Sequence, residues 1–427
     1  MHSNHSTVFR FLILALTSAA VAPRASSAAE IKVPHDRPTL RAALETAVAG
    51  DQVLVSPGVY RERIRLKAGV VMRSAGGNDV NAAGALVRAA ATVIDGGGEA
   101  GEGPGVAMAE SSVLDGFTVT NVGVYDEKVW KQHFDSHGED LGDDEGALQA
   151  EGSSPAIQIE GVTCSVLHCI VHHNGDVGVG ILGKAGAKTT PLVADNQVYR
   201  NMGGGIGAAE GAEPIIRGNQ CSENLRAGIG CRQANPLIID NACFRNVRAG
   251  IGCREGSRPM IRGNKCYLNR RAGIGIRMPG TAPIVAANEC YENEMAGIGC
   301  RDGASPLLRG NVCRDNKLVA IGVTEGSNAV IVDNELSRVG GVPPLIAVKD
   351  QSTAVIADNR ISGGGVAAVL IQGQATIRGN TFTSRQPKQG PAVWVWSQST
   401  AIIADNKVDG YSAAVKPDPQ AKVIESK

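Results

Sequence analysis

The sequence has few aromatic residues, no net charge and no long apolar segment after its N-terminus. Aromatic side chains make up 4% of the 427 residues, so small side chains must fill any large core. The 42 basic residues equal the 42 acidic ones, which argues against nucleic-acid binding, because that function usually leaves a basic excess. After residue 29, no apolar run approaches the roughly 20 residues of a membrane span.

The first 29 residues have the features of an export signal. Arg10 precedes the apolar run FLILALTSAAVA, and the small residues ASSAA follow it, which predicts cleavage near Ala29. The apolar run is too short to span a membrane. We therefore expect a secreted or periplasmic chain that starts near Glu30.

Glycine is abundant, with 54 residues, and much of it lies in a repeat. NLRAGIGCR, starting at Asn224, has close copies starting at Asn246, Asn269 and Asn293. One asparagine marks each unit, at intervals of 21 to 26 residues. These markers are Asn196, Asn219, Asn241, Asn264, Asn288, Asn311, Asn334, Asn359, Asn380 and Asn406. A fixed period of this length indicates a solenoid.

The apolar residues of each unit alternate, which is typical of strands with one buried face. In RAGIGCR, Ala227, Ile229 and Cys231 share one parity and are predicted to face the core. The arginines and glycines share the other parity and are predicted to face solvent. A second short strand, such as PLIID, precedes each marker asparagine. Short strands without helices predict an all-β, single-domain parallel β-helix.

Stacked coils explain the asparagines and cysteines of the repeat. Equivalent side chains form ladders at about 4.8 Å, so an inward asparagine can hydrogen-bond its neighbours above and below. Five units place a cysteine two residues after the marker, and Ile276 replaces a cysteine in a second column. We therefore expect buried free thiols rather than disulfides or a zinc site.

The residue pattern predicts a cap at the N-terminal side of the β-helix and a tail at its C-terminal side. TLRAALETAVAGD places Leu40, Leu44 and Val48 on one face of a short helix with Thr39 as its N-cap. This helix predicts an N-terminal cap over residues 30–51, followed by the β-helix over 52–415. Residues 416–427 are predicted to be a polar, frayed tail.

The segments IKVPHDRPTLRAALETAVAGDQVLVSPGVY and SVLDGFTVTN, with the N-x-C repeats, resemble the right-handed parallel β-helix, pectin lyase-like superfamily. Within it they are most similar to the carbohydrate-binding and sugar-hydrolase repeat group that includes NosD-type periplasmic proteins. The resemblance implies either polysaccharide lyases, hydrolases, esterases and epimerases, or non-catalytic accessory proteins. The aspartate-pair signature of the hydrolases and the Asp-Pro-His-Asp motif of the alginate epimerases are absent from this sequence. The fold by itself does not select an activity.

Two predicted outward columns of arginine flank the repeat glycines and form a candidate surface for an anionic polysaccharide. Residues 200–310 contain 15 basic and 9 acidic residues, an excess of six. Glycine lets a flat chain approach the backbone, and guanidinium groups match carboxylates or sulfates. Alternatively, acids such as Glu255 and Asp302 pair with the arginines in a solvated lattice. The candidate binding residues are Arg226, Arg232, Arg248, Arg254, Arg271, Arg277 and Arg301.

Residues 124–153 interrupt the repeat with nine acids and two lysines, which predicts an acidic insertion. Within it, His133, Asp135 and His137 are candidate ligands of a transition metal, and the acidic run at 140–145 would suit Ca²⁺. The alternative is a solvated acidic loop with incidental histidines. The sequence supports no cofactor beyond these two options.

The segment HCIVHHNGDVGVGI supplies the candidate catalytic residues His172, His173 and Asp176. The repeat alignment places Asp176 in the arginine column two coils before Arg226. An acid, two histidines and the arginine surface would then converge in an acid–base centre. Ordinary turn polarity explains the same residues. Asp302 and Glu325, expected on adjacent coils, are a weaker carboxylate pair for which ion pairing is the favoured role.

The segment PAVWVWSQST places Val393 and Val395 inward and predicts that Trp394 and Trp396 continue the glycine and arginine columns outward. Such rings could form a platform for sugar stacking, or they could cap the last coils.

Together these features predict an exported β-helix protein that binds an extended anionic polysaccharide along its arginine and glycine face. Cleavage by a lyase or hydrolase mechanism is one possibility. A non-catalytic periplasmic binding or accessory protein of the NosD type, including a metal-handling one, and a structural surface protein are the alternatives. The sequence does not determine the oligomeric state.

Overall fold

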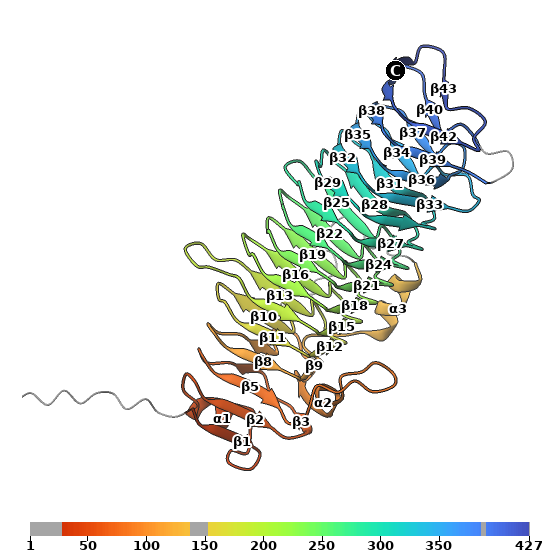
Figure 1. The fold of residues 1–427 in the computed structure, drawn as a ribbon. Coiled ribbons are helices and arrows are strands. Elements are labelled where there is room, and N and C mark those ends of the chain that lie inside the picture. Colours follow the sequence, from red (N-terminus) through yellow and green to blue (C-terminus); the bar gives the residue numbers. More distant parts are fainter. Residues whose placement is uncertain (1–27, 137–152, 386–389, 427) are drawn as a thin grey trace, which may run out of the picture.

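The computed structural model describes residues 28–136, 153–385 and 390–426, and it is a right-handed parallel β-helix. Three parallel sheets run along the solenoid (Figure 1). Three helices lie among the described residues: α1 (Leu40–Thr46), α2 (Val87–Ala91) and α3 (Glu127–Asp135). Residues 1–27, which hold most of the predicted export signal, lie outside the described residues.

Sheet A has sixteen strands. They are β1 (Glu30–Val33), β2 (Gln52–Val55), β5 (Val71–Ser74), β8 (Val113–Asp115), β11 (Ser165–Leu167), β14 (Leu192–Ala194), β17 (Ile215–Arg217), β20 (Leu237–Ile239), β23 (Met260–Arg262), β26 (Ile284–Ala286), β29 (Leu307–Arg309), β32 (Asn328–Val332), β35 (Thr353–Ala357), β38 (Gln374–Arg378), β41 (Thr400–Ala404) and β44 (Lys422–Ser426).

Sheet B has fourteen strands. They are β3 (Gly58–Tyr60), β6 (Thr92–Asp95), β9 (Thr118–Thr120), β12 (Ile170–His172), β15 (Gln197–Tyr199), β18 (Gln220–Ser222), β21 (Ala242–Phe244), β24 (Lys265–Tyr267), β27 (Glu289–Tyr291), β30 (Val312–Arg314), β33 (Glu335–Arg338), β36 (Arg360–Gly363), β39 (Thr381–Thr383) and β42 (Lys407–Asp409).

Sheet C also has fourteen strands. They are β4 (Ile64–Arg65), β7 (Val106–Ala107), β10 (Ile157–Glu160), β13 (Val179–Leu182), β16 (Ile206–Ala209), β19 (Ile229–Arg232), β22 (Ile251–Arg254), β25 (Ile274–Arg277), β28 (Ala296–Arg301), β31 (Val319–Val323), β34 (Ile346–Val348), β37 (Val369–Ile371), β40 (Val393–Val395) and β43 (Val415–Pro417).

Two asparagine ladders hold the coils in register. In the marker ladder, each Asn Nδ2 donates to the next Asn Oδ1, as from Asn241 to Asn264 at 2.9 Å. The second ladder follows sheet B and includes the bond from Asn246 to Asn269 at 3.1 Å. It begins at Asn174, which donates to Asn201 at 2.9 Å. Each buried amide is thus satisfied by its neighbours, as predicted.

The ten cysteines all lie within the described residues and are buried and free, which confirms the prediction of core thiols. Cys221, Cys243 and Cys266 occupy consecutive positions of sheet B. The hydrogen bond with the thiol of the preceding coil raises the pKa of Cys243 and of Cys266, and burial raises it further, so these groups stay protonated in the folded protein.

The alternation predicted for RAGIGCR holds for only part of the motif. Ile229 and Cys231 face the core and Gly230 faces outward, as predicted. Gly228 instead faces inward, because a Cβ at this position would lie 2.8 Å from both the Asn246 Nδ2 atom and the Gly250 carbonyl oxygen. Ala227 Cβ lies on the outer side, 3.6 Å from the Cβ position of Gly252. The chain turns before β19 begins, and the turn shifts the side-chain parity.

Both ends of the described part of the chain, at β1 and β44, belong to the solenoid. Thr39 Oγ1 accepts a hydrogen bond from the Ala42 amide in the first turn of α1 at 3.1 Å, and Leu40 and Leu44 are buried. The helix ends at Thr46, which leaves Val48 57% exposed instead of on the apolar face. β1 already pairs with β2 before the predicted start of the solenoid, and β43 and β44 continue it through the predicted tail.

Helix α3 forms within the acidic insertion and lies against the corner between sheets B and C (Figure 1). Asp126 caps its N-terminus by accepting from the Lys128 and Val129 amides. Trp130 is 5% exposed and packs against Met202, Leu225 and Val247 on successive coils. Among the described residues, no helix is long and apolar enough to cross a membrane.

Candidate functional site

The outer face of sheet C carries a column of glycines in strand register. Gly230 pairs with Gly252, Gly252 with Gly275, and Gly275 with Gly299. Two residues after each of these glycines lies one of the arginines Arg232, Arg254, Arg277 and Arg301. We call these eight residues the arginine–glycine face. The inward column that contains Gly228 and Gly250 is not part of it, so the bare backbone strip is one glycine wide per coil instead of two.

The arginines of this face have acidic partners in the turns that follow. Arg232 lies 3.7 Å from Glu210, Arg254 lies 3.5 Å from Glu255, and Arg277 lies 3.2 Å from Asp302. The arginine side chains remain 20% to 42% exposed. The ion pairs expected from a solvated lattice are therefore present, while the guanidinium groups still reach the surface.

The second arginine column borders the glycines on the side of helix α3. Backbone hydrogen bonds connect Asp176, Gly203, Arg226, Arg248 and Arg271 in order, which confirms the predicted column. Arg248 is 8% exposed, so the prediction that this column faces outward is wrong for Arg248, while Arg226 and Arg271 are partly exposed. Met295 and Leu318 continue it as exposed apolar residues, and the basic character ends there.

Two tryptophans lie in the continuation of the glycine and arginine columns toward the C-terminus, as predicted, although Ala347 and Leu370 before them are buried. Val393 and Val395 are buried, and Trp394 follows Gly322, Ala347 and Leu370 in the glycine column. Lys416 Nζ lies 3.9 Å from the Trp394 ring centre, and Trp394 Nε1 donates to Asp418 at 2.9 Å. Trp396 is 40% exposed and offers the more accessible ring.

The candidate catalytic residues lie on different faces. His172 ends β12 on sheet B, where its ring stacks on Tyr199 at 5.0 Å. His173 Nδ1 lies 2.7 Å from His172 Nδ1, and its ring contacts Tyr125 of the acidic insertion. Asp176 belongs to the column beside sheet C and is 7% exposed. The insertion therefore does reach the histidine pair, but the pair projects from another sheet than the arginine–glycine face.

The charges near the histidine pair come from Arg200 and Glu127, which are joined at 2.6 Å. Burial, His173 and Arg200 lower the pKa of His172 to about 4. Burial and Arg200 also lower the pKa of His173. His172 is therefore neutral at pH 7, and its stacked, half-buried ring suits a packing role.

The predicted metal site is only partly described, because His137 and the acidic run at 140–145 lie outside the described residues. His133 and Asp135 are in α3, and Asp135 pairs with Lys131 at 2.8 Å. Within the described ranges, no three His, Cys, Asp or Glu side chains are grouped so that they could hold a metal ion. The metal assignment therefore stays a prediction.

Asp302 and Glu325 meet on adjacent coils beside the arginine–glycine face. Their carboxyl groups share a hydrogen bond that lowers the pKa of Asp302 and raises that of Glu325. Asp302 also contacts Arg277 and Arg301, at 3.2 and 3.7 Å. Ion pairing, the role favoured for both carboxylates, is present for Asp302.

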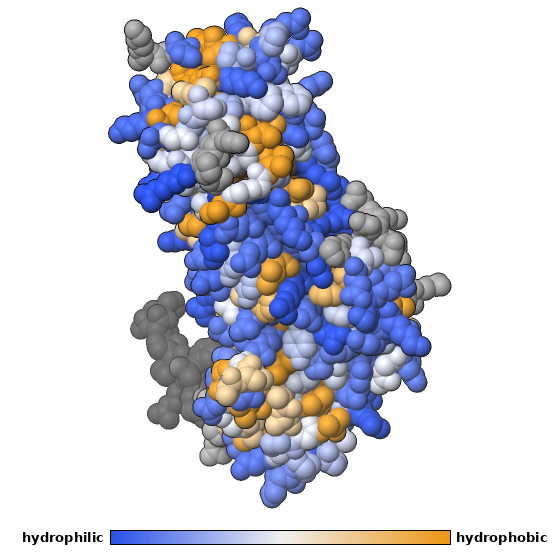
Figure 2. Space-filling view, turned by 90° about the vertical axis from the view of Figure 1, so that its right-hand side faces the viewer, coloured by the Kyte–Doolittle hydropathy of each residue, from blue (hydrophilic) through white to orange (hydrophobic). Residues whose placement is uncertain are grey.

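A surface on sheet B was not anticipated from the repeat pattern. The residue after the inward cysteine is aromatic on several coils, and Phe244, Tyr267 and Tyr291 stack with ring centres 4.9 Å apart. In the sequence, the segments NACF, NKCY and NECY each place an aromatic residue directly after the inward cysteine. Figure 2 shows the side of the molecule that carries α3, where hydrophilic surface predominates along the middle.

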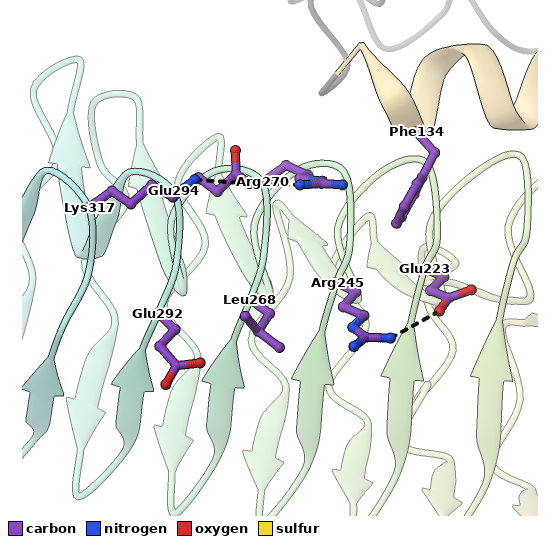
Figure 3. A pocket seen from close by; sticks show the side chains of 8 residues that line it. All are labelled: Phe134, Glu223, Arg245, Leu268, Arg270, Glu292, Glu294 and Lys317. Atoms are coloured by element: carbon purple, nitrogen blue, oxygen red, sulfur yellow. Dashed lines mark hydrogen bonds and ion pairs between the residues drawn. The ribbon is translucent and has the colours of Figure 1, made fainter.

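A shallow pocket of about 350 Å³ lies where sheet B meets α3. Figure 3 shows Phe134 pointing from α3 toward side chains on successive coils. The pocket is lined by Phe134, Glu223, Arg245, Leu268, Arg270, Glu292, Glu294 and Lys317. Its three acidic and three basic residues balance, in contrast to the arginine–glycine face.

Comparison with known proteins gives one family and several solved structures. The family model "Right handed beta helix region" matches residues 147–282 and 279–408. The A-module of mannuronan C-5 epimerase AlgE4 from Azotobacter vinelandii is 17% identical, with 90% of this chain and 95% of that chain covered and a TM-score of 0.43. The periplasmic alginate epimerase AlgG is 11% identical, with 94% and 84% covered and a TM-score of 0.41. The Dettilon tailspike protein is 12% identical, with 90% and 68% covered and a TM-score of 0.46. No curated protein matches the chain in sequence.

Proposed function

Because the chain belongs to the right-handed β-helix family, we propose that it is an exported protein that binds an extended anionic polysaccharide along the arginine–glycine face. The register of sheet C is the observation that supports this proposal. It repeats one outward glycine and one arginine on four consecutive coils. A ligand with a charge on each unit would thus meet the same pair of groups at every step.

The geometry of the face suits a flat, charged polymer. A glycine offers no side chain, so a sugar ring can approach the backbone along the strip. Guanidinium groups donate two parallel hydrogen bonds to a carboxylate or sulfate. The second column, with Arg226, Arg248 and Arg271, adds positive charge along the opposite border.

The ion pairs with Glu210, Glu255 and Asp302 do not prevent such binding. Exposed ion pairs contribute only about 0 to 1 kcal/mol each, because water competes for both partners. A ligand carboxylate can therefore join or replace a turn acid at low cost. The same acids keep the stacked arginines from repelling each other when no ligand is bound.

Binding without bond cleavage is the better supported form of this proposal. His172 and His173 project from sheet B, and the His172 ring is stacked and half buried. The Asp302 and Glu325 pair lies beside the face, but Asp302 is engaged by Arg277 and Arg301. A lyase or hydrolase would release unsaturated products or reducing ends from uronate or sulfated polysaccharides, and we expect neither during long incubations.

The binding proposal is tested by Arg254→Ala combined with Arg277→Ala on an anionic-glycan column. The double variant removes two charge-assisted contacts at the surface, each worth up to about 1 kcal/mol, so the affinity should fall about tenfold. Arg217→Ala with Arg262→Ala removes the same charge from exposed positions on sheet A and is the matched control. Equal retention of the two double variants, with both folded, would refute the proposal.

A further inference from the structure

The outer surface of sheet B carries a second column of chemical interest, which starts beside the histidine pair. Strand register places His172, Tyr199, Ser222, Phe244 and Tyr267 at equivalent positions on consecutive coils. Tyr291 and then Arg314 follow. The column is therefore a ladder of rings in which a single serine occupies one ring position.

The rings on either side of that serine are stacked away from it. Tyr199 stacks on His172 at 5.0 Å, and Phe244 stacks on Tyr267 at 4.9 Å. Arg314 covers the far end of the ladder, 4.1 Å from the Tyr291 ring centre. The Tyr199 and Phe244 positions are two coils apart, which is about 9.6 Å. A ring placed midway would have the ladder spacing to both neighbours.

The position of Ser222 is the vacant ring position of the ladder, and polar groups surround it. Ser222 is half buried at its base, and Gln220 lies exposed two residues earlier on the same strand. Glu223 follows Ser222 in the left-handed conformation, with φ 55°. Its carboxylate lies 3.9 Å from Arg200 and 4.0 Å from Arg245, so it is held between the two neighbouring coils.

The vacant position adjoins the pocket under α3. Glu223 and Arg245 line that pocket as well, and Figure 3 shows both beneath Phe134. Trp130 Nε1 donates to the Glu223 carbonyl at 3.1 Å, which ties the helix to the same turn. On the other side, Gln197 donates to the Gly84 carbonyl, so the 75–91 excursion ends beside β15. We call the ring position at Ser222, between Tyr199 and Phe244, the notch.

We propose that this notch binds an uncharged sugar ring, with the vacant ring position and the adjoining pocket as consecutive subsites. Aromatic faces stack against the apolar faces of sugars, while carboxylate, amide and hydroxyl groups bind their hydroxyls. The equal numbers of acidic and basic residues in the pocket favour a neutral, hydroxyl-rich ligand over a polyanion. The site is on sheet B and is therefore separate from the arginine–glycine face of sheet C.

A substitution that completes the ladder tests the site without removing any contact of the fold. Ser222→Tyr would place a ring between Tyr199 and Phe244 at the ladder spacing, so it should preserve or raise stability while it fills the notch. Ser337→Tyr adds the same ring in the same column five coils further along and is the matched control. Phe244→Ser removes one wall instead of filling the space.

The probes are cello-, manno-, chito- and maltohexaose, measured by calorimetry and saturation-transfer NMR. We expect at least one hexaose to bind the wild type and the Ser337→Tyr variant equally. Ser222→Tyr and Phe244→Ser should weaken that binding at least tenfold. The absence of binding by all four probes, or equal binding to Ser222→Tyr and Ser337→Tyr, would overturn the proposal. Neither outcome bears on anionic-glycan retention, which depends on the other face.

Discussion

On the outer faces of both sheets B and C, equivalent residues of successive coils stack in columns, but the two faces differ in chemistry. On sheet C the outward position is glycine with an arginine two residues later, which gives a flat and basic strip. On sheet B the outward position is a ring on five of the six coils from β12 to β27, which gives a stacked column beside a charge-balanced pocket. In a parallel solenoid a single residue choice, repeated, becomes a continuous surface.

The largest expected effect is a difference in stability between substitutions in the inward and in the outward glycine column. Gly250→Ala places a Cβ 2.8 Å from the Gly273 carbonyl and 2.9 Å from Asn269 Nδ2, so it should lower the free energy of unfolding by about 1–3 kcal/mol. Gly252→Ala adds a Cβ at 3.6 Å from Ala227 Cβ and should leave stability within about 0.5 kcal/mol. Urea unfolding measures both. Equal losses would contradict the assignment of the outward column.

The second effect concerns pH and should be confined to sheet B. The pKa of His172 is lowered to about 4, so the folded state binds fewer protons than the unfolded chain between about pH 4 and 6.5. The contribution of the neutral His172 ring to the free energy of unfolding is on the order of 2 kcal/mol. It is complete above pH 6.5 and is lost as the pH falls toward 4.

Replacing the titrating ring separates this effect from general acid destabilisation. His172→Phe keeps a ring against Tyr199 but cannot be protonated, so its stability should change less between pH 7 and 4 than that of the wild type. Hydrogen exchange should also show β12 and β15 losing protection before β19 and β22. An identical pH slope in the variant would exclude His172 as the source.

The smallest expected effect is the difference in stability loss between one substitution on sheet B and one on sheet C. Tyr267→Ala breaks two ring contacts at 4.9 Å and should cost about 1–2 kcal/mol of stability. Arg277→Ala loses a half-exposed ion pair and should cost under about 1 kcal/mol. Denaturation midpoints at high and low salt measure both. A larger loss for Arg277→Ala would mean that the arginines serve stability more than binding.

Much of the candidate site was predictable because it follows the repeat. The alignment placed Asp176 in the column of Arg226, and it placed Trp394 beyond the glycines, and both positions hold in the strand register. The ring ladder was not predicted, although NACF, NKCY and NECY contain its rings, because the alternation with inward cysteines accounts for these strands whatever residue stands outward. The docking of Trp130 against three coils had no comparable signal, because it joins residues far apart in the chain.

By itself, the sequence determined the solenoid, its register and its free core thiols, because an asparagine or cysteine repeated at one period must meet its equivalents on adjacent coils. Only the tertiary structure decided the side on which each glycine lies, since a turn before β19 shifts the parity. It also decided which charges pair and that the histidines project from sheet B. These outcomes depend on corner geometry and on the docking of α3, which a one-dimensional pattern does not contain.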